Sequence, residues 1–143
     1  SLPRSFSIMK ITISQDKSLL DVSFIYTFLS QSYWAKGRSI EAVKKSIDHS
    51  VCYGVYIDEE QIGFARVVSD RAVYAYIMDV FILPNHQGKG YGQQLMESII
   101  HDPAFADVPQ WHLGTKDAHG LYEKFGFRLL PDPERWMVRK ITD

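Results

Sequence analysis

The stretch DVFILPNHQGKGYGQQLM, from Asp79 to Met96, decides how this chain is interpreted. It begins as an apolar run rich in β-branched and aromatic residues, which is typical of a strand. Glycines then occupy positions 88, 90 and 92, and an amphipathic helical pattern follows. Because glycine in a helix costs about 1 kcal/mol relative to alanine, the segment must need bare backbone for some purpose.

Two interpretations of these glycines remain open from the residues alone. The first backbone N–H groups of a helix have no internal partner and point toward an incoming anion. Glycine would let this backbone approach a phosphate closely, and Lys89 would add positive charge to the cradle. Alternatively, the glycines only permit a tight turn where the strand and the helix cross.

The two common phosphate-binding motifs do not fit the segment. In a Walker loop, G-x-x-x-x-G-K-[ST], the first glycine would fall on Leu83 and the final Ser or Thr on Gly90. In the dinucleotide motif G-x-G-x-x-G, the third glycine would fall on Gln93 or Leu95, depending on which glycine starts the motif. The segment therefore belongs to neither class.

Outside this stretch, the spacing of apolar residues alternates between strand-like and helix-like periods. Helices are expected over about 18–31, 40–50, 90–102 and 117–126, and strands over 9–15, 51–57, 61–68, 72–83, 111–115, 127–130 and 135–141. Ser39 is the expected N-cap of the second helix, and PDPE at 131–134 is the expected turn between the last two strands. The fold class is therefore α/β, a mixed sheet of about seven strands flanked by about four helices. The segment 74–114 should form a right-handed parallel crossover.

Composition limits the functions that are open to the chain. Its 143 residues fit one domain, and a net charge of -1 provides no basic field for nucleic acid or an anionic membrane. Cys52 is the only cysteine, so there is no internal disulfide and no cysteine cluster for a metal. No apolar run approaches the roughly 20 residues of a membrane span. We expect a cytoplasmic protein that binds neither nucleic acid nor membrane, with residues 1–8 a cloning remnant or disordered.

Two motifs, in order, resemble the GNAT superfamily of N-acetyltransferases. In the first, a strand of the D/E-hydrophobic-aromatic-V-x-P kind precedes Q/R-x-x-G-x-G/A, with Gln87, Gly90 and Gly92 at the matching positions. The second, DAHGLYEKFGF, resembles the family's A-x-x-L-Y-E-K-x-G-F signature, with Tyr122 at the tyrosine position. The resemblance covers most of the chain and implies a single GNAT-like acetyltransferase domain over 1–143.

The resemblance implies that acetyl-CoA is the acetyl donor and lies in a cleft where the fourth and fifth strands splay apart. Its diphosphate would take N–H groups of the glycine loop, and its pantetheine would pair with strand main chain. The implied cofactor-binding residues are Val80, Phe81, Ile82, Gln87, Gly88, Lys89, Gly90, Tyr91, Gly92, Thr115 and Tyr122. Thr115 stands where many relatives have Asn, so its hydroxyl would replace only part of that contact. Gly88 falls on a variable position, and we expect it only to ease the turn.

The resemblance also implies direct transfer of the acetyl group to a primary amine of a small molecule or peptide, through a ternary complex. Tyr122 is the expected acid for the departing thiolate; the alternative is a core aromatic with a bonded hydroxyl. Asp79 is the candidate base, although a strand carboxylate bound to backbone or to an arginine explains it slightly better. His119 lies one helical turn before Tyr122, either near the thioester or in solvent. No spacing predicts a metal site.

By family analogy, the acceptor contacts the segment between the first two helices, which contains Tyr33, Trp34 and Arg38. The aromatics would hold a cation or a ring, and Arg38 would pair with a carboxylate or phosphate; alternatively, both aromatics only pack the corner between the helices. Arg66, Tyr74 and Tyr76 on the strands are further candidates for the cleft, and Trp136 would either close the core or line the site. The sequence identifies no particular acceptor, and a homodimer is one possible assembly. The alternative functions are a non-catalytic acyl-CoA sensor or interaction module, a different acyl donor, and an O-acceptor.

Overall fold

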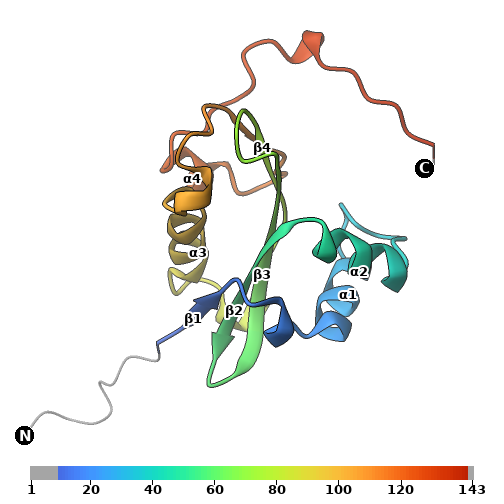
Figure 1. The fold of residues 1–143 in the computed structure, drawn as a ribbon, viewed down its shortest axis with the longest axis vertical. Helices are drawn as coiled ribbons and strands as arrows, with labels where there is room; N and C mark the ends of the chain where they lie inside the picture. Colours follow the sequence, from blue (N-terminus) through green and yellow to red (C-terminus); the bar gives the residue numbers. More distant parts are fainter. Residues whose placement is uncertain (1–9, 142–143) are drawn as a thin grey trace, which may run out of the picture.

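The computed structural model describes residues 10–141, so the expectation for residues 1–8 lies outside the described part. Five strands form one sheet in the order β1-β2-β3-β4-β5 (Figure 1). Their bounds are β1 Thr12–Ser14, β2 Val51–Ile57, β3 Glu60–Ser69, β4 Ala75–Ile82 and β5 Trp111–Leu113. The first four strands pair antiparallel, and β4 pairs with β5 in parallel. The mixed α/β class and the parallel crossover are therefore confirmed.

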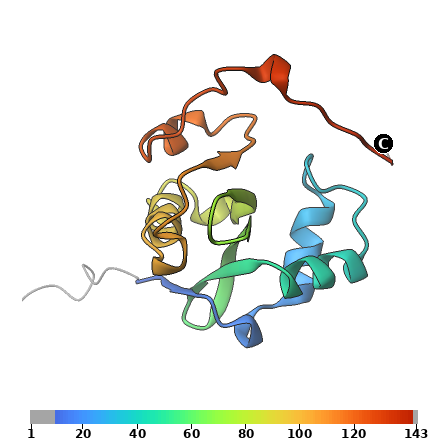
Figure 2. The ribbon, with the colours of Figure 1, turned by 45° about the horizontal axis from the view of Figure 1, so that its top comes forward.

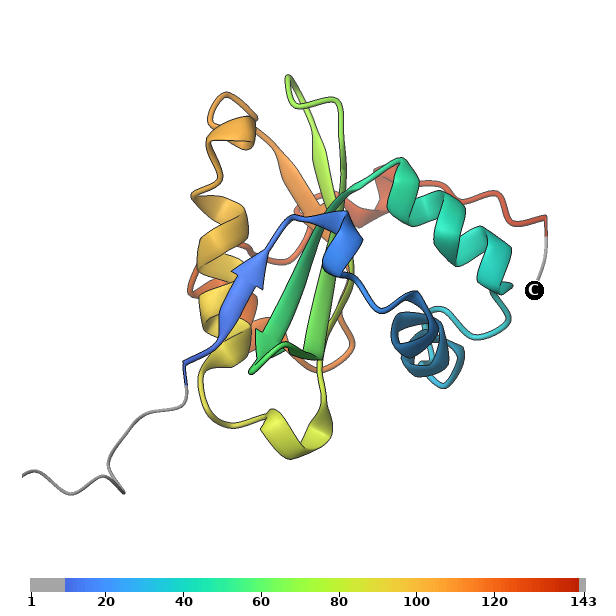
Figure 3. The ribbon, with the colours of Figure 1, turned by 60° about the horizontal axis from the view of Figure 1, so that its bottom comes forward.

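Helices cover both faces of this sheet. They are α1 Val22–Ser30, α2 Ile40–Asp48, α3 Tyr91–Ile100 and α4 His119–Glu123. Figures 1 and 3 show α3 and α4 on one side of the sheet and α1 and α2 on the other. Tyr53 packs in the core with Leu95 of α3, whereas its neighbour Cys52 packs in the core with Leu29 of α1, because side chains alternate along a strand. No helix within residues 10–141 has the length and apolar character to cross a membrane.

Side-chain caps determine where the first two helices begin. The Ser39 hydroxyl accepts from the Ala42 N–H at 3.1 Å, so the expected N-cap of α2 is confirmed. The first helix begins later than expected, because residues 17–19 form a separate 3-10 turn and extended backbone follows. Asp21 then caps α1 by accepting from the Phe24 N–H at 3.0 Å.

The prediction of two closing strands, at 127–130 and 135–141, is wrong. Within residues 10–141 these segments join no sheet, so the sheet has five strands rather than about seven. A tight hairpin needs residues with positive φ, and residues 131–134 have none. Pro131 and Pro133 fix their own φ and bias the residue before each toward extended backbone. Residues 128–141, named here the C-terminal arm, therefore cross the molecule beside β5 without pairing with it (Figure 2), and the Trp136 ring lies 4.4 Å from that of His112.

Strands β4 and β5 separate after a short paired stretch. Their pairs run only from Ala75–Trp111 to Ile77–Leu113, while β4 continues to Ile82. On its other side, the register with β3 shifts between Phe64 and Arg66, which is a β-bulge. The extra residue belongs to β4, between Met78 and Phe81, and Asp79 lies in this bulge with φ of 54°, a left-handed conformation that Asp tolerates better than most residues. The splayed cleft predicted between the fourth and fifth strands is present.

Candidate active site

A cavity of about 870 Å³ opens where β4 and β5 separate, a size typical of small-molecule and cofactor sites. Its walls come from β4, the glycine loop, the segment after β5, α4, and the segment that joins α1 to α2. The structure brings the predicted cofactor and acceptor residues to this cavity except Lys89, which does not line it. Of the further candidates for the cleft, Tyr76 lines it, whereas Arg66, Tyr74 and Trp136 do not. Residues far apart in the sequence thus form one site.

The glycine loop presents a row of unpaired backbone N–H groups beside this cavity. From Gly88 through Gln93, these groups have no hydrogen-bond acceptor within residues 10–141. Gly90 is the N-cap of α3 with φ of 82°, and Gly88 has φ of 79°, so the backbone requires both glycines rather than Gly90 alone. Gly92 has no such strain; an added Cβ would lie 3.6 Å from Leu121 Cδ2, an ordinary contact. Free N–H groups at a helix N-terminus form a binding site for an anion.

Two of the expected cofactor residues bind their own chain. Gln87 Nε2 donates to the Ile82 carbonyl at 2.8 Å, and the Gln87 N–H donates to the Pro84 carbonyl at 3.3 Å. Gln87 therefore fixes the corner between β4 and the loop, which the sequence did not predict. The Thr115 hydroxyl accepts from the Ala118 N–H at 3.0 Å, so it shapes the entry to α4 while lining the cavity.

Beyond Ile77, β4 has an open main-chain edge on the side of β5. The cavity is lined there by Val80, Phe81 and Ile82, the residues expected to pair with pantetheine. The Phe81 ring stacks on Phe28 with centroids 3.9 Å apart, which fastens α1 to the sheet. An extended ligand can bind such an edge as an added strand.

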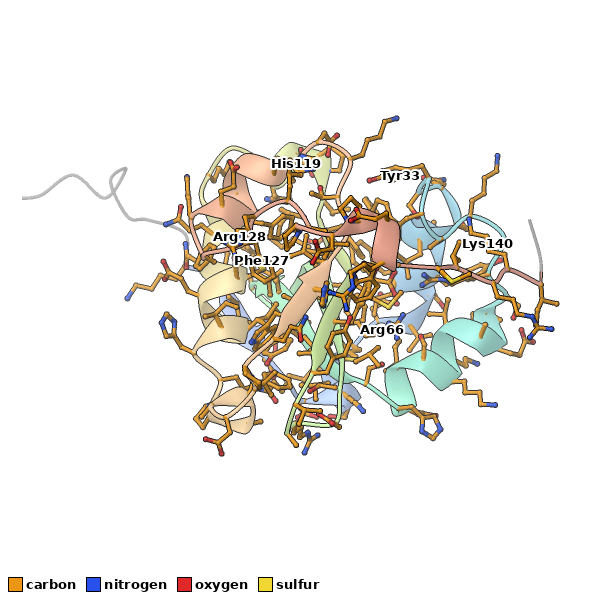
Figure 4. The ribbon with its side chains drawn as sticks, turned by 90° about the horizontal axis from the view of Figure 1, so that it is seen from above. Tyr33, Arg66, His119, Phe127, Arg128 and Lys140 are labelled. Carbon is orange, nitrogen blue, oxygen red and sulfur yellow. The ribbon has the colours of Figure 1, made fainter. Side chains whose placement is uncertain are left out.

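Tyr122 lies on the α4 wall of the cavity with only 8% of its surface exposed. Its ring packs edge-on against Phe127 at 6.2 Å, and its hydroxyl has no hydrogen-bond partner within the described residues. Burial, with smaller contributions from Tyr33 and Asp117, raises the pKa of Tyr122 to about 12. The hydroxyl therefore stays protonated at neutral pH and is free to donate into the cavity. His119, by contrast, is exposed at the start of α4 and does not line the cavity (Figure 4).

Asp79 is buried and accepts hydrogen bonds on both carboxylate oxygens. Oδ1 accepts from Trp34 Nε1 at 3.0 Å, while Oδ2 accepts from Arg38 Nη1 at 2.8 Å and from Arg66 Nε at 2.9 Å. Arg66 is itself buried and also donates to the Ser50 hydroxyl at 3.0 Å. Of the two interpretations of Asp79, these contacts favour the carboxylate bound to arginine. The sequence marked Arg66 only as a residue near the cleft and carried no signal for this ion pair.

Tyr33 links the two sides of the cavity. Its hydroxyl accepts from the Lys116 N–H at 3.1 Å, which joins the α1–α2 segment to the segment after β5. The Lys116 ammonium lies 5.4 Å from the Tyr33 ring centroid, within the range of a cation–π contact. The Tyr33 ring meets Trp34 edge-on at 5.2 Å. All three predicted acceptor residues are thus at one end of the cavity, and Trp34 and Arg38 are held there by Asp79.

The described residues contain no group of three or more histidine, cysteine or acidic side chains that could hold a metal ion. His86 lines the cavity, whereas His112 of β5 lies between the rings of Tyr74 and Trp136, with centroids 5.2 and 4.4 Å away. The cavity offers a ligand backbone N–H groups, a free strand edge and the Tyr122 hydroxyl, with Trp34 and Arg38 at its acceptor end.

Comparison with known proteins identifies this arrangement. A family model described as an acetyltransferase (GNAT) domain matches residues 48–129. A Gibberella zeae relative assigned to the acetyltransferases is 30% identical over 117 residues, which are 68% of this chain and 66% of that protein. An uncharacterized N-acetyltransferase of Gracilaria tenuistipitata is 34% identical over 110 residues, 73% of this chain and 60% of that protein. The chain thus spans less than two thirds of the length of these curated relatives.

Solved structures agree with this assignment. The crystal structure of a Xanthomonas campestris protein assigned to the GNAT family is 41% identical and superposes with a TM-score of 0.89, covering 94% of this chain and 96% of that chain. A GNAT family acetyltransferase from Elizabethkingia anophelis, solved with acetyl-CoA bound, is 21% identical with a TM-score of 0.65, covering 84% of this chain and 77% of that chain. The second likeness concerns the fold alone. The chain belongs to the GNAT family of acetyltransferases.

Proposed function

We propose that this protein transfers the acetyl group of acetyl-CoA directly to a primary amine of a small molecule or peptide, in a ternary complex. The row of unpaired N–H groups from Gly88 through Gln93 is the observation that carries the proposal. These groups would hold the diphosphate, and the open edge of β4 beyond Ile77 would hold the pantetheine. When bound, acetyl-CoA supplies an acetyl thioester to the cavity.

Tyr122 and Asp79 take different roles in this proposal. The Tyr122 O–H donates its proton to the leaving thiolate, because its raised pKa of about 12 keeps it protonated and no other acceptor within the described residues competes for it. The acceptor would react as the neutral amine, and the proton that its nitrogen loses when the amide forms would restore the Tyr122 phenol, so that the products are the amide and the free thiol. Asp79 would be a positioning residue, and not the base, because it holds Trp34 and Arg38 at the acceptor end. Both of its oxygens already accept from cationic or indole donors, which leaves it poorly suited to take a proton from an amine.

Titration calorimetry with two thioesters tests the diphosphate site. Acetyl-CoA should bind with a Kd at least 100-fold lower than acetyl-pantetheine, which carries the same thioester but lacks the diphosphate and the nucleotide attached to it. A similar Kd for both compounds would contradict the assignment of the glycine loop. Thiol release should then be measured over a panel of primary amines, with mass spectrometry of the product. Tight acetyl-CoA binding without release on any amine would favour the sensor, and an acetylated alcohol would favour the O-acceptor.

Single alanine substitutions separate ligand contact from backbone strain in the loop. Gly88 and Gly90 have nearly the same φ, 79° and 82°, and an added Cβ at either meets nothing within 4 Å. Gly88→Ala and Gly90→Ala should therefore lose similar folding stability, about 1–2 kcal/mol each. We expect Gly90→Ala to raise the Kd of acetyl-CoA about tenfold more than Gly88→Ala does, since Gly90 begins the helix.

Gly92→Ala is the control for this pair, because its backbone is helical and its Cβ has room beside Leu121. It should leave the Kd nearly unchanged and raise the folding stability by up to about 1 kcal/mol. Equal effects of Gly88→Ala and Gly90→Ala on the Kd would show that the stretch is only a turn.

A further inference from the structure

The acceptor end of the cavity carries more positive than negative charge. Arg38 and Arg66 both pair with Asp79, at 2.8 and 2.9 Å, so a single carboxylate faces two guanidinium groups. The Lys116 ammonium, which lies 5.4 Å from the Tyr33 ring centroid, adds a third cation at this end. A buried or half-buried excess of positive charge favours a ligand that brings a negative charge with it.

Arg38 keeps most of its hydrogen-bonding capacity for such a ligand. A guanidinium has five N–H donors, and within residues 10–141 the one side-chain hydrogen bond of Arg38 runs from Nη1 to Asp79. The Arg38 side chain lines the cavity and is 25% exposed. Arg66, by contrast, is 8% exposed, and each of its three side-chain nitrogens has a partner. Arg66 therefore balances the charge of Asp79, and Arg38 remains available to a second anion.

The acidic residues on the cavity wall do not suit a polycationic acceptor. Within the described part of the chain, the acids that line this cavity are Asp79 and Asp117. Both oxygens of Asp79 are taken by donors of the protein. Asp117 is exposed beside α4, where it contributes to the raised pKa of Tyr122. A polyamine or a lysine-rich segment would therefore meet the like charges of Arg38 and Lys116 without a free carboxylate at the same end.

The order of the site along β4 places Arg38 beside the reacting end of the donor. The glycine loop, which would hold the diphosphate, follows Ile82 in the sequence. A pantetheine that starts at this loop and pairs with Val80, Phe81 and Ile82 would run back along β4, so its thioester would lie toward Asp79. Asp79 in turn holds Arg38. An anion bound by Arg38 would thus belong to the acceptor rather than to the diphosphate of the donor.

We propose that the acceptor is a primary amine that carries its own anionic group, a carboxylate or a phosphate, and that Arg38 binds this group. This proposal rests on the proposed function, since it names the acceptor class of the same site. A planar guanidinium binds either anion through two parallel hydrogen bonds. Tyr33, Trp34 and Tyr76 give the same cavity an aromatic wall for the rest of the acceptor (Tyr33 is labelled in Figure 4). An amino acid with an apolar side chain has both features.

Matched pairs of acceptors test this preference by thiol release. L-Phenylalanine and L-phenylalaninamide differ only in the carboxylate, and O-phosphoethanolamine and ethanolamine differ only in the phosphate. The anionic member of at least one pair should have a kcat/KM about 10- to 100-fold higher, the contribution of a hydrogen bond to a charged group. The pair that shows this preference identifies the anion. Because a nearby anion raises the pKa of the amine, the protonation of the amine itself works against this result.

Variants of the segment between α1 and α2 assign the preference to Arg38. Arg38→Gln should reduce it to less than about threefold, whereas Arg38→Lys keeps the charge without the planar geometry and should retain part of it. Lys36→Gln is the matched control, because Lys36 is an exposed cation of the same segment that does not line the cavity. It should keep the wild-type preference. An equal loss in Arg38→Gln and Lys36→Gln would show an effect of general surface charge and would overturn the proposal.

Binding of the acetylated products separates this proposal from the proposed function. Calorimetry in the presence of CoA gives the Kd of N-acetyl-L-phenylalanine and of its amide, and of the two acetylated ethanolamines, for the wild type and Arg38→Gln. A lower Kd for an anionic product that depends on Arg38 would support the anion site even if no amine is acetylated, in which case the proposed function alone fails. Acetyl transfer with equal or higher kcat/KM for the neutral member of both pairs would leave the transferase and overturn the anionic acceptor. Equal Kd values without any transfer would overturn both.

Discussion

Tyr122→Phe should lower kcat for acetyl transfer by about 100- to 10,000-fold, the range over which a positioned general acid contributes. The substitution removes only the hydroxyl, whose proton would go to the departing thiolate. Phenylalanine keeps the ring that packs against Phe127, so the fold and the Kd of acetyl-CoA should change little. Single-turnover rates and calorimetry on the same preparation measure the two effects separately.

Tyr76→Phe is the matched control for this experiment. Tyr76 lines the same cavity, and removing its hydroxyl should alter kcat by less than threefold. Because the pKa of Tyr122 is raised to about 12, kcat/KM should keep rising with pH toward the pKa of the acceptor amine, about 10.4 for a lysine-like amine. An unchanged kcat for Tyr122→Phe, or a fall in kcat/KM toward high pH that persists in this variant, would remove Tyr122 from the acid role.

The sequence predicted those parts of the fold that depend on neighbouring residues. Ser39 caps α2 because its own side chain reaches the first turn, and the glycine loop joins strand to helix through its own backbone. The prediction of two closing strands was wrong because a strand needs a neighbouring strand to pair with, and composition does not show whether the fold provides one. The apolar pattern of 135–141 is real, but the prolines at 131 and 133 oppose the hairpin that would bring it back.

The same distinction holds for the candidate site: residues that stand in a local motif could be predicted, whereas contacts between segments distant in the sequence could not. The glycines and Tyr122 stood in motifs and were found at the cavity. The hydrogen bond from Gln87 to Ile82 and the ion pair from Arg66 to Asp79 were missed, since each depends on how the chain turns between the two residues. For Asp79, the deciding feature is the β-bulge of β4 where it faces β3, which places the Asp79 carboxylate between two arginines.

Asp79→Asn should lower the free energy of unfolding by about 3–5 kcal/mol, because removing one partner leaves the buried Arg66 without a counter-ion. For a domain of this size, the expected drop in Tm is about 10–20 °C. Asn tolerates positive φ as well as Asp does, so the φ of 54° should not itself contribute. Thermal unfolding measures the loss, and Asp107→Asn, an exposed acid with no ion pair in the described residues, should leave Tm within about 1 °C.

Substitution of Arg66, the buried arginine that pairs with Asp79, provides the decisive variant. If the instability comes from an unpaired buried charge, Arg66→Met combined with Asp79→Asn should recover most of the lost stability, since an apolar side chain of similar size replaces the charge. The loss of the contacts to Trp34 and Arg38 should still raise the KM for the acceptor in both variants. A base would behave in the opposite way: Asp79→Asn would keep its Tm and lose kcat, and the Arg66 substitution would restore nothing. The combination of Tm, KM and kcat therefore decides whether Asp79 holds the acceptor end in place or takes a proton from the amine.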